Sequence, residues 1–311
     1  MYNEYSVSMK WCEQQERMDL MLYALENADL LVQVRDHGAE LRSIKERADE
    51  TEYLWRGDPT WWKYSAPLLF PIVGKLVDGK YRVGGKTYEL PAHGLARISD
   101  FTLVEQKKDA IRFMLSWTEE SLKQYPWKFR LEVGYVLVGR SIRVTWDVTN
   151  EDETEMVFSI GAHPALRCPI VYGEKLEDCY VEFNREEDTE CYQLAPGVLF
   201  SHEKEPSLQG TKLPLTDALF AGGVRAYDDL KSDTLTIRST KSEKSISIFA
   251  PGFPYWGLWM PEKGGGPFLC LEPWYGHADF ADFTGEFVDK AGTQKLAPGK
   301  TFHAEYTITI G

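Results

Sequence analysis

The sequence predicts an all-β protein, built as a large single-domain β-sandwich. Three observations lead to this prediction. Short runs of alternating apolar and polar residues recur along the 311-residue chain, and Gly, Pro, Asn and Asp separate them. Long helical periodicity is nearly absent. No fixed-period repeat, low-complexity tract or linker divides the chain, so one domain of packed sheets is the expected architecture.

The expected domain covers residues 23–311, and residues 1–22 are expected to form an N-terminal extension. This extension is polar and mixed, with Glu4, Lys10 and Glu13 where a signal peptide would carry an apolar run. The chain also lacks a stretch of ~18 apolar residues that could span a membrane. We therefore expect a cytoplasmic protein.

The strand predictions follow the alternating pattern from residue 23 onward. Two such runs flank Gly84-Gly85, which predicts a tight β-hairpin. Residues 66–76 are apolar but contain two prolines, so a central strand cannot run through all of them. Residues 119–125 suit one short helix, and residues 168–215 are expected to be loop-rich with several short strands. Further strands are predicted at 28–34, 40–44, 51–55, 101–105, 111–117, 129–138, 141–149, 224–227, 234–239, 245–249, 255–259 and 301–310.

Charge and cysteine content narrow the classes of function. The formal net charge is −13, and an acidic surface argues against general binding to nucleic acid or an anionic membrane, since both need a cationic surface. A small sugar or sugar phosphate, held by one or two local cations, is compatible with this charge. The cysteines are odd in number and form no C-x-x-C pair, so we expect free thiols and no metal site. They are Cys12, Cys168, Cys179, Cys191 and Cys270.

One predicted strand ends in a carboxylate. Residues 268–272 form a short apolar run that reaches Glu272, and we expect Pro273 to end the strand there, because proline cannot continue a sheet ladder. A carboxylate at the end of a buried strand is costly unless it is paired or used. Cys270 shares the face of Glu272, and Trp274 comes next on that face if the chain stays extended. An acid beside an aromatic ring indicates a candidate sugar site.

Two histidines lie in comparable settings. His163 ends the run 156–163, precedes Pro164, and shares its strand face with small side chains that leave room for a ligand. His93 lies in a loop within one turn's reach of Arg97. A carboxylate and an imidazole in a shared cleft are the minimum for general acid–base catalysis. For each of these residues taken singly, a structural polar role is the alternative interpretation.

Four short motifs follow one another along the chain. They are Phe70-Pro71-Ile72-Val73-Gly74-Lys75-Leu76, His93-Gly94-Leu95-Ala96-Arg97, Gly161-Ala162-His163-Pro164 and Leu271-Glu272-Pro273-Trp274. In their order and spacing, the chain resembles the aldose 1-epimerase (mutarotase) family, and looks most like the bacterial branch associated with lactose and tagatose-6-phosphate operons. The likeness covers nearly the whole chain from about Tyr23. It implies a large β-sandwich, often called a supersandwich, and no cofactor.

The resemblance also implies catalytic roles for two residues. Glu272 matches the general base, which takes the proton from the anomeric C1 hydroxyl. His163 matches the general acid, which protonates the ring oxygen. The sugar ring then opens to the aldehyde, the C1–C2 bond rotates, and closure on the other face reverses both proton transfers. Two proton carriers near neutral pH suffice for this chemistry, and each contributes ~10²–10⁴-fold.

Binding roles follow from the same resemblance. His93 matches a histidine that helps to bind the sugar. Lys75 occupies a position where the family usually has arginine; it keeps the charge but loses the two-pronged donor geometry. Arg97 matches an arginine that related sugar-phosphate epimerases use for the phosphate. Among the tryptophans, we expect Trp274 to stack on the apolar face of the sugar.

The predicted function is therefore that of an aldose 1-epimerase acting on a hexose or hexose 6-phosphate. A non-catalytic sugar-binding or sensor protein on the same scaffold is the alternative, although a pure binder needs no matched acid and base. A glycoside hydrolase would need two carboxylates flanking the scissile bond, and only Glu272 has such a setting. The sugar-binding aspartate of galactose mutarotases has two candidate matches, Asp217 and Asp228.

Overall fold

The protein is built almost entirely of β-strands packed in sheets, which confirms the predicted fold class. A computed structural model describes residues 22–261 and 266–311. Cys12 and residues 1–21 of the expected N-terminal extension lie outside these ranges. Within them, the only α-helix is the short α2 (Glu119–Leu122), and no helix is long and apolar enough to cross a membrane.

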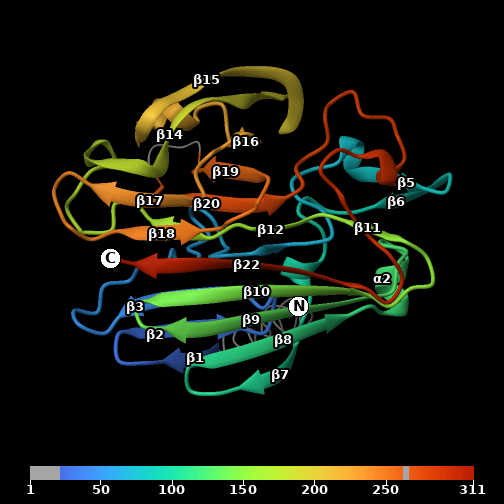
Figure 1. Ribbon diagram of the computed structural model, residues 1–311, viewed down its shortest axis with the longest axis horizontal. Coiled ribbons are helices and arrows are strands. Elements are labelled where there is room, and N and C mark those ends of the chain that lie inside the picture. Colours follow the sequence, from blue (N-terminus) through green and yellow to red (C-terminus); the bar gives the residue numbers. More distant parts are fainter. Residues whose placement is uncertain (1–21, 262–265) are drawn as a thin grey trace, which may run out of the picture.

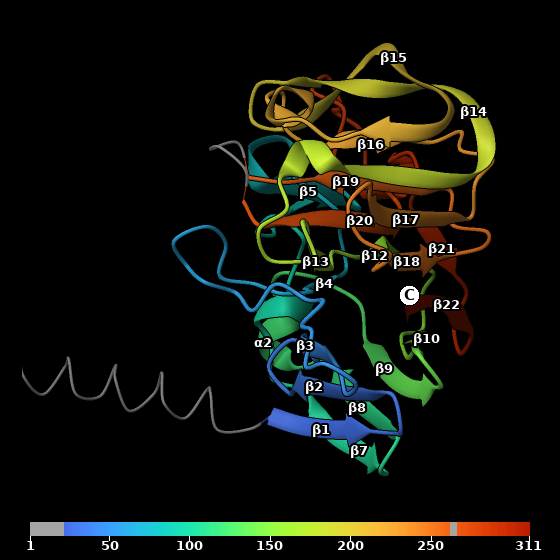
Figure 2. The same ribbon diagram turned by 90° about the vertical axis from the view of Figure 1, so that its left-hand side faces the viewer.

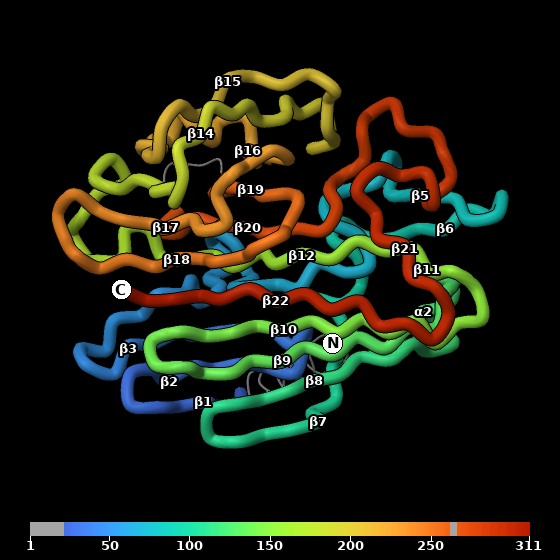
Figure 3. Tube along the Cα trace, in the orientation of Figure 1, coloured from blue at the N-terminus to red at the C-terminus, as the bar shows by residue number. Residues whose placement is uncertain are grey.

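The largest sheet has nine strands (Figure 1). The C-terminal strand lies inside it, between strands from the middle of the chain (Figure 3). In spatial order the strands are β15 (Leu199–Pro214), β14 (Cys179–Ala195), β17 (Thr234–Ser239), β18 (Ile246–Phe249), β22 (Thr301–Ile310), β10 (Ser141–Asn150), β9 (Phe129–Val138), β8 (Ala110–Ser116) and β7 (Thr102–Gln106).

A second sheet carries the residues of interest. Its strands are β16 (Arg225–Tyr227), β19 (Tyr255–Trp259), β20 (Phe268–Tyr275), β12 (Ile160–Ala162) and β4 (Leu68–Leu69), and β13 (Ala165–Arg167) also pairs with β20. Three small sheets complete the fold: β1 (Leu22–Glu26) with β2 (Leu30–Arg35) and β3 (Leu41–Glu46), β5 (Lys80–Val83) with β6 (Lys86–Glu89), and β11 (Met156–Phe158) with β21 (Gln294–Leu296). Short 3-10 turns occur at Val77–Gly79, Ala96–Ile98, Leu176–Asp178, Asp217–Phe220 and Phe287–Asp289.

Large apolar side chains hold the layers together. Alternation along β10 turns Trp146 inward, where it is buried. Phe70, next to β4, contacts Phe129 of β9 with ring centroids 5.1 Å apart, so the second sheet packs against the nine-stranded one. Tyr23 of β1 contacts Phe113 of β8 at 5.3 Å, and the β1–β3 sheet lies beside the β7–β9 end of the large sheet (Figure 2).

The strand predictions are mostly confirmed, including the hairpin at Gly84-Gly85 and the short helix. Residues 51–55 were wrongly predicted as a strand, since Glu52 and Leu54 form only isolated bridges. The prediction of a loop-rich region between Cys168 and Leu215 is also wrong, because it holds β14 and β15, strands of 17 and 16 residues. Register shifts interrupt their pairing, and such bulges break the two-residue alternation that reveals a strand.

Candidate active site

Strand β20 supplies the candidate base, and it corrects one prediction. The strand does not end at Pro273 but continues to Tyr275, and Pro273 pairs with Trp256 of β19. On its other side β20 pairs with β13 and then with β12, and the two ladders are separated at His163 and Pro164. Pro273 faces this interruption, where a missing N–H costs the sheet little.

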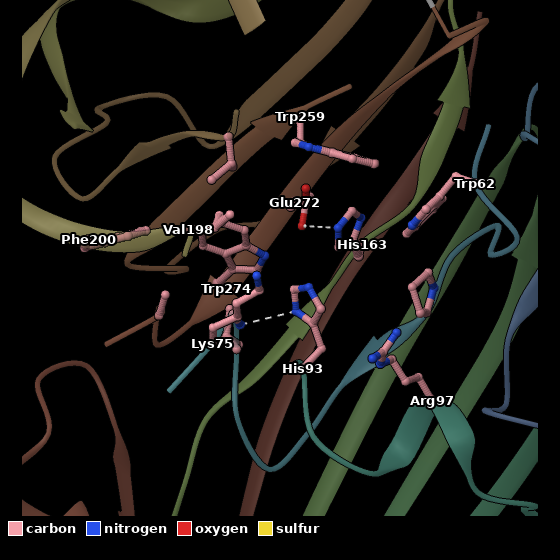
Figure 4. A pocket seen from close by; sticks show the side chains of 15 residues that line it. Trp62, Lys75, His93, Arg97, His163, Val198, Phe200, Trp259, Glu272 and Trp274 are labelled. Atoms are coloured by element: carbon pink, nitrogen blue, oxygen red, sulfur yellow. Dashed lines mark hydrogen bonds and ion pairs between the residues drawn. The ribbon is translucent and has the colours of Figure 1, made fainter. Parts of the chain in front are cut away.

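The register of the second sheet brings the candidate acid and base together. Gly161 pairs with Trp274, and Ala165 pairs with Cys270, so His163 lies directly opposite Glu272. Residues opposite each other on antiparallel strands have neighbouring side chains. The Nε2 atom of His163 accordingly lies 3.3 Å from Oε2 of Glu272 (Figure 4).

The pair opens onto a cavity of about 210 Å³. This volume is below the ~300–1,000 Å³ typical of sites for drug-sized ligands, so the cavity suits a smaller molecule. All of the site residues predicted from the sequence line it (Figure 4): Lys75, His93, Arg97, His163, Glu272 and Trp274.

Burial controls the charge of the acid–base pair. Glu272 is 1% exposed, and burial raises its pKa well above the usual range, while the indole N–H of Trp274 opposes part of the rise. Burial also lowers the pKa of His163 well below its usual range, and the neighbouring His93 and Arg97 lower it further. Both shifts favour the uncharged forms. We therefore interpret the pair as a carboxylic acid on Glu272 beside a neutral imidazole on His163, with the acidic proton shared between the two groups.

His93 is held in the cavity wall by its own backbone and by Gly74. Its φ angle is +64°, in the left-handed region, and its N–H donates to the carbonyl of Gly74 at 2.8 Å. Its Nδ1 accepts from the N–H of Gly74 at 3.2 Å, which assigns the ring proton to Nε2. Burial, followed by the charges of Arg97 and Lys75, lowers the pKa of His93 to about 3. His93 is therefore a neutral hydrogen-bond donor.

A family model described as aldose 1-epimerase matches residues 21–294. The chromosomal protein LacX of Lactococcus lactis subsp. lactis is 38% identical over 299 residues, which cover 93% of this chain and 99% of LacX. The chain belongs to the aldose 1-epimerase family. The plasmid-encoded LacX protein of the same Lactococcus lactis subspecies is also 38% identical over 299 residues.

Solved structures of family members agree with the fold. A galactose mutarotase related enzyme from Lactobacillus acidophilus superimposes with a TM-score of 0.90 at 32% identity, covering 94% of this chain and 97% of that one. A galactose mutarotase-like protein from Lactobacillus casei gives a TM-score of 0.88 at 31% identity, covering 93% of this chain and 100% of that one. These likenesses support a sugar epimerase or a related function.

The two cations of the site have different surroundings within this epimerase-family fold. Lys75 is exposed at the cavity rim. Arg97 donates from its guanidinium to the carbonyl of Ala92 at 2.8 Å, and lies over the ring of Tyr64 at 4.9 Å. Its Nε has no hydrogen-bond partner among the described residues. Arg97 thus has donor capacity left for a ligand.

Glycine makes the space for Trp274. A Cβ atom at Gly257 would lie 2.3 Å from the indole, and one at Gly161 would lie 2.6 Å from it. Only glycine on both neighbouring strands lets the ring lie this close to the sheet. The indole N–H is buried and makes no well-formed hydrogen bond with the described residues, although it is near enough to Glu272 to lower the pKa of that carboxyl group. Trp274 therefore offers the cavity both a ring and an unused donor.

Sequence reasoning missed part of the wall. Trp62 and Trp259 flank His163 with ring centroids at 4.8 and 5.5 Å. Val198, in the turn between β14 and β15, and Phe200, at the start of β15, also line the cavity. The expectation that Trp274 alone stacks on the sugar left out Trp259, although Trp259 pairs with Cys270 of β20. No sequence signal points to Trp62. The two candidate aspartates, Asp217 and Asp228, do not line the cavity, and Asp228 is bound by Tyr192 and Lys204.

Proposed function

We propose that this protein is an aldose 1-epimerase that interconverts the α and β anomers of a hexose or hexose 6-phosphate without a cofactor. One observation carries the proposal. A buried carboxyl group and a buried imidazole, those of Glu272 and His163, lie 3.3 Å apart at the wall of one small cavity. General acid–base chemistry needs this pair of groups, with pKa values set by their surroundings.

The proton count of the pair balances over the reaction. Ring opening starts once the proton shared by the pair has moved from Glu272 to His163, which leaves carboxylate on Glu272 and imidazolium on His163. The carboxylate takes the C1 hydroxyl proton, the C1 oxygen becomes the aldehyde carbonyl, the C1–O5 bond breaks, and the imidazolium gives its proton to O5. The pair is then carboxylic acid and neutral imidazole, which is the form that burial favours. Rotation about C1–C2 and closure on the other face return both protons.

The remaining residues are proposed to bind the sugar. His93 donates its Nε2 proton to a sugar oxygen, since its Nδ1 is engaged by Gly74. Trp274 packs on an apolar face of the ring and can donate its free indole N–H. Lys75 contacts hydroxyl groups from the rim, and Arg97 binds the phosphate of a hexose 6-phosphate through its unused donors.

Anomer exchange tests this proposal. A panel of free and 6-phosphorylated hexoses is followed by polarimetry and by NMR exchange, with buffer alone as the blank. We expect at least one sugar to interconvert faster than the blank. If a sugar binds in calorimetry but none interconverts faster than the blank, the protein is instead a non-catalytic sugar binder on this scaffold.

A further inference from the structure

A third donor atom lies beside the acid–base pair. Cys270 precedes Glu272 by two residues on β20, and both side chains lie on one face of the strand. The ligand atoms of His163, Cys270 and Glu272 all lie within 4.8 Å of one another. All three residues are buried, and Cys270 is fully so. Imidazole nitrogen, thiolate sulfur and carboxylate oxygen are the three donor types that zinc takes in proteins.

A second, independent observation points to a ligand here. Neither carboxylate oxygen of Glu272 accepts a well-formed hydrogen bond from the described residues, although the side chain is 1% exposed. Buried polar groups nearly always have a partner, which can be protein, water or an ion. Once the carboxyl group of Glu272 gives up its proton, both of its oxygens are therefore available for a cation that enters beside His163.

We propose that a thiophilic divalent cation, with Zn²⁺ as the type case, binds to His163, Cys270 and Glu272. Bonds of about 2.0–2.3 Å in tetrahedral geometry put donor atoms roughly 3.3–3.7 Å apart. His163 and Glu272 are already 3.3 Å apart, and side-chain movement of about 1 Å brings in Cys270. Three protein ligands leave a fourth position open toward the cavity, as in zinc sites that exchange ligands.

Charge and protons are consistent with this site. The thiolate and the carboxylate supply two negative charges, which offset the repulsion from Lys75 and Arg97 across the cavity. When the metal binds, the thiol of Cys270 and the protonated carboxyl group of Glu272 each release a proton to the buffer. The sequence does not reveal the site because its donors come from β20 and from the break between β12 and β13 rather than from a C-x-x-C motif.

The cation acts as an inhibitor. A metal on His163 and Glu272 occupies both proton carriers and competes with the sugar. This consequence rests on the proposed function, whereas metal binding itself does not. Zn²⁺ should therefore suppress anomer exchange competitively with the sugar, and the suppression should require Cys270.

The test is a Co²⁺ titration of the full chain, in which a thiolate-to-cobalt charge-transfer band in the near ultraviolet reports sulfur coordination. Zn²⁺ affinity is measured by competition with a chromophoric chelator. We expect the band in the native protein and its loss in Cys270→Ala and in Cys270→Ser. Loss of an outer-shell partner already weakens metal affinity ~10–100-fold, so loss of Cys270 should weaken Zn²⁺ binding by at least about tenfold.

Two matched variants locate the metal. Cys191→Ala removes another buried thiol, and Cys12→Ser removes the cysteine outside the described residues; both should keep the band. Thermal unfolding checks that every variant is folded, and the Cys270→Ser variant stays close to the native volume. A native protein without the band, or a band that persists in folded Cys270 variants, overturns the proposal.

An activity arm separates this inference from the proposed function. Zn²⁺ inhibition, measured relative to the metal-free rate of each variant, should be lost in Cys270→Ala. If the cobalt band appears but the metal-free protein epimerises no sugar, the proposed function fails and the metal site stands. If the metal-free protein is active but shows no band, the metal site fails and the proposed function stands.

Discussion

Replacing Glu272 with glutamine tests the proposed base and the effect of its burial in one variant. Glutamine is close to glutamate in volume, so the fold should survive, but an amide cannot act as a base. The substitution breaks no well-formed hydrogen bond, since neither oxygen of Glu272 accepts one from the described residues. A positioned proton carrier contributes ~10²–10⁴-fold to a rate. The rate of anomer exchange in Glu272→Gln should therefore fall by a factor within this range or above it.

The same substitution should change how stability depends on pH. Burial raises the pKa of Glu272 well above 4.5, so the folded state binds more protons at this group than the unfolded state. Its contribution to the free energy of unfolding therefore falls as the pH rises from 4.5 toward the folded pKa. One pKa unit corresponds to ~1.36 kcal/mol. In this window, the free energy of unfolding of Glu272→Gln should therefore rise relative to that of the native protein by up to this amount for each pH unit.

His163 contributes with the opposite sign. Burial, and then His93 and Arg97, lower its pKa well below 6.5, so its contribution to stability rises as the pH rises toward 6.5. In the native protein the two contributions oppose each other between 4.5 and 6.5, whereas only the rising one remains in Glu272→Gln. Urea denaturation at several pH values across this window measures both free energies of unfolding.

Glu187 supplies a matched control. Its side chain is also buried, but it accepts hydrogen bonds from the backbone N–H groups of Lys231 and Ser232 and does not line the cavity. Glu187→Gln should keep the full exchange rate. A fully active Glu272→Gln variant would refute the base assignment. A stability difference from the native protein that does not change with pH would refute the argument from burial.

Three further substitutions test the surroundings of the site. Arg97→Ala should slow exchange of a hexose 6-phosphate much more than that of the free hexose, and equal losses would remove the phosphate from the proposal. Lys290 Nζ lies 2.8 Å from Asp279 Oδ1 with both side chains buried, so Lys290→Ala should cost ~3–5 kcal/mol in chemical denaturation; an unchanged midpoint would contradict this. Gly257→Ala puts a Cβ 2.3 Å from the Trp274 ring, so calorimetry should show weaker sugar binding, and native affinity would contradict the role given to this glycine.

The sequence identifies the cavity residues more readily than their geometry. His93, His163 and Glu272 could be found because each is followed by a glycine or proline, although the proline after Glu272 does not end its strand. Their convergence could not be derived, since it depends on which strands pair and in which register. Trp62 was not predicted because it lies in an irregular segment and reaches His163 only through tertiary packing.

The separation between acid and base is a property of sheet register. Side chains alternate between the faces of a strand, so a slip of one residue between β12 and β20 would turn His163 away from Glu272. Pro164 and Pro273 lie at the interruption between the β12 and β13 ladders, where neither has to donate to the sheet. The paired ladders on either side of this interruption therefore fix the register in which the two proton carriers meet.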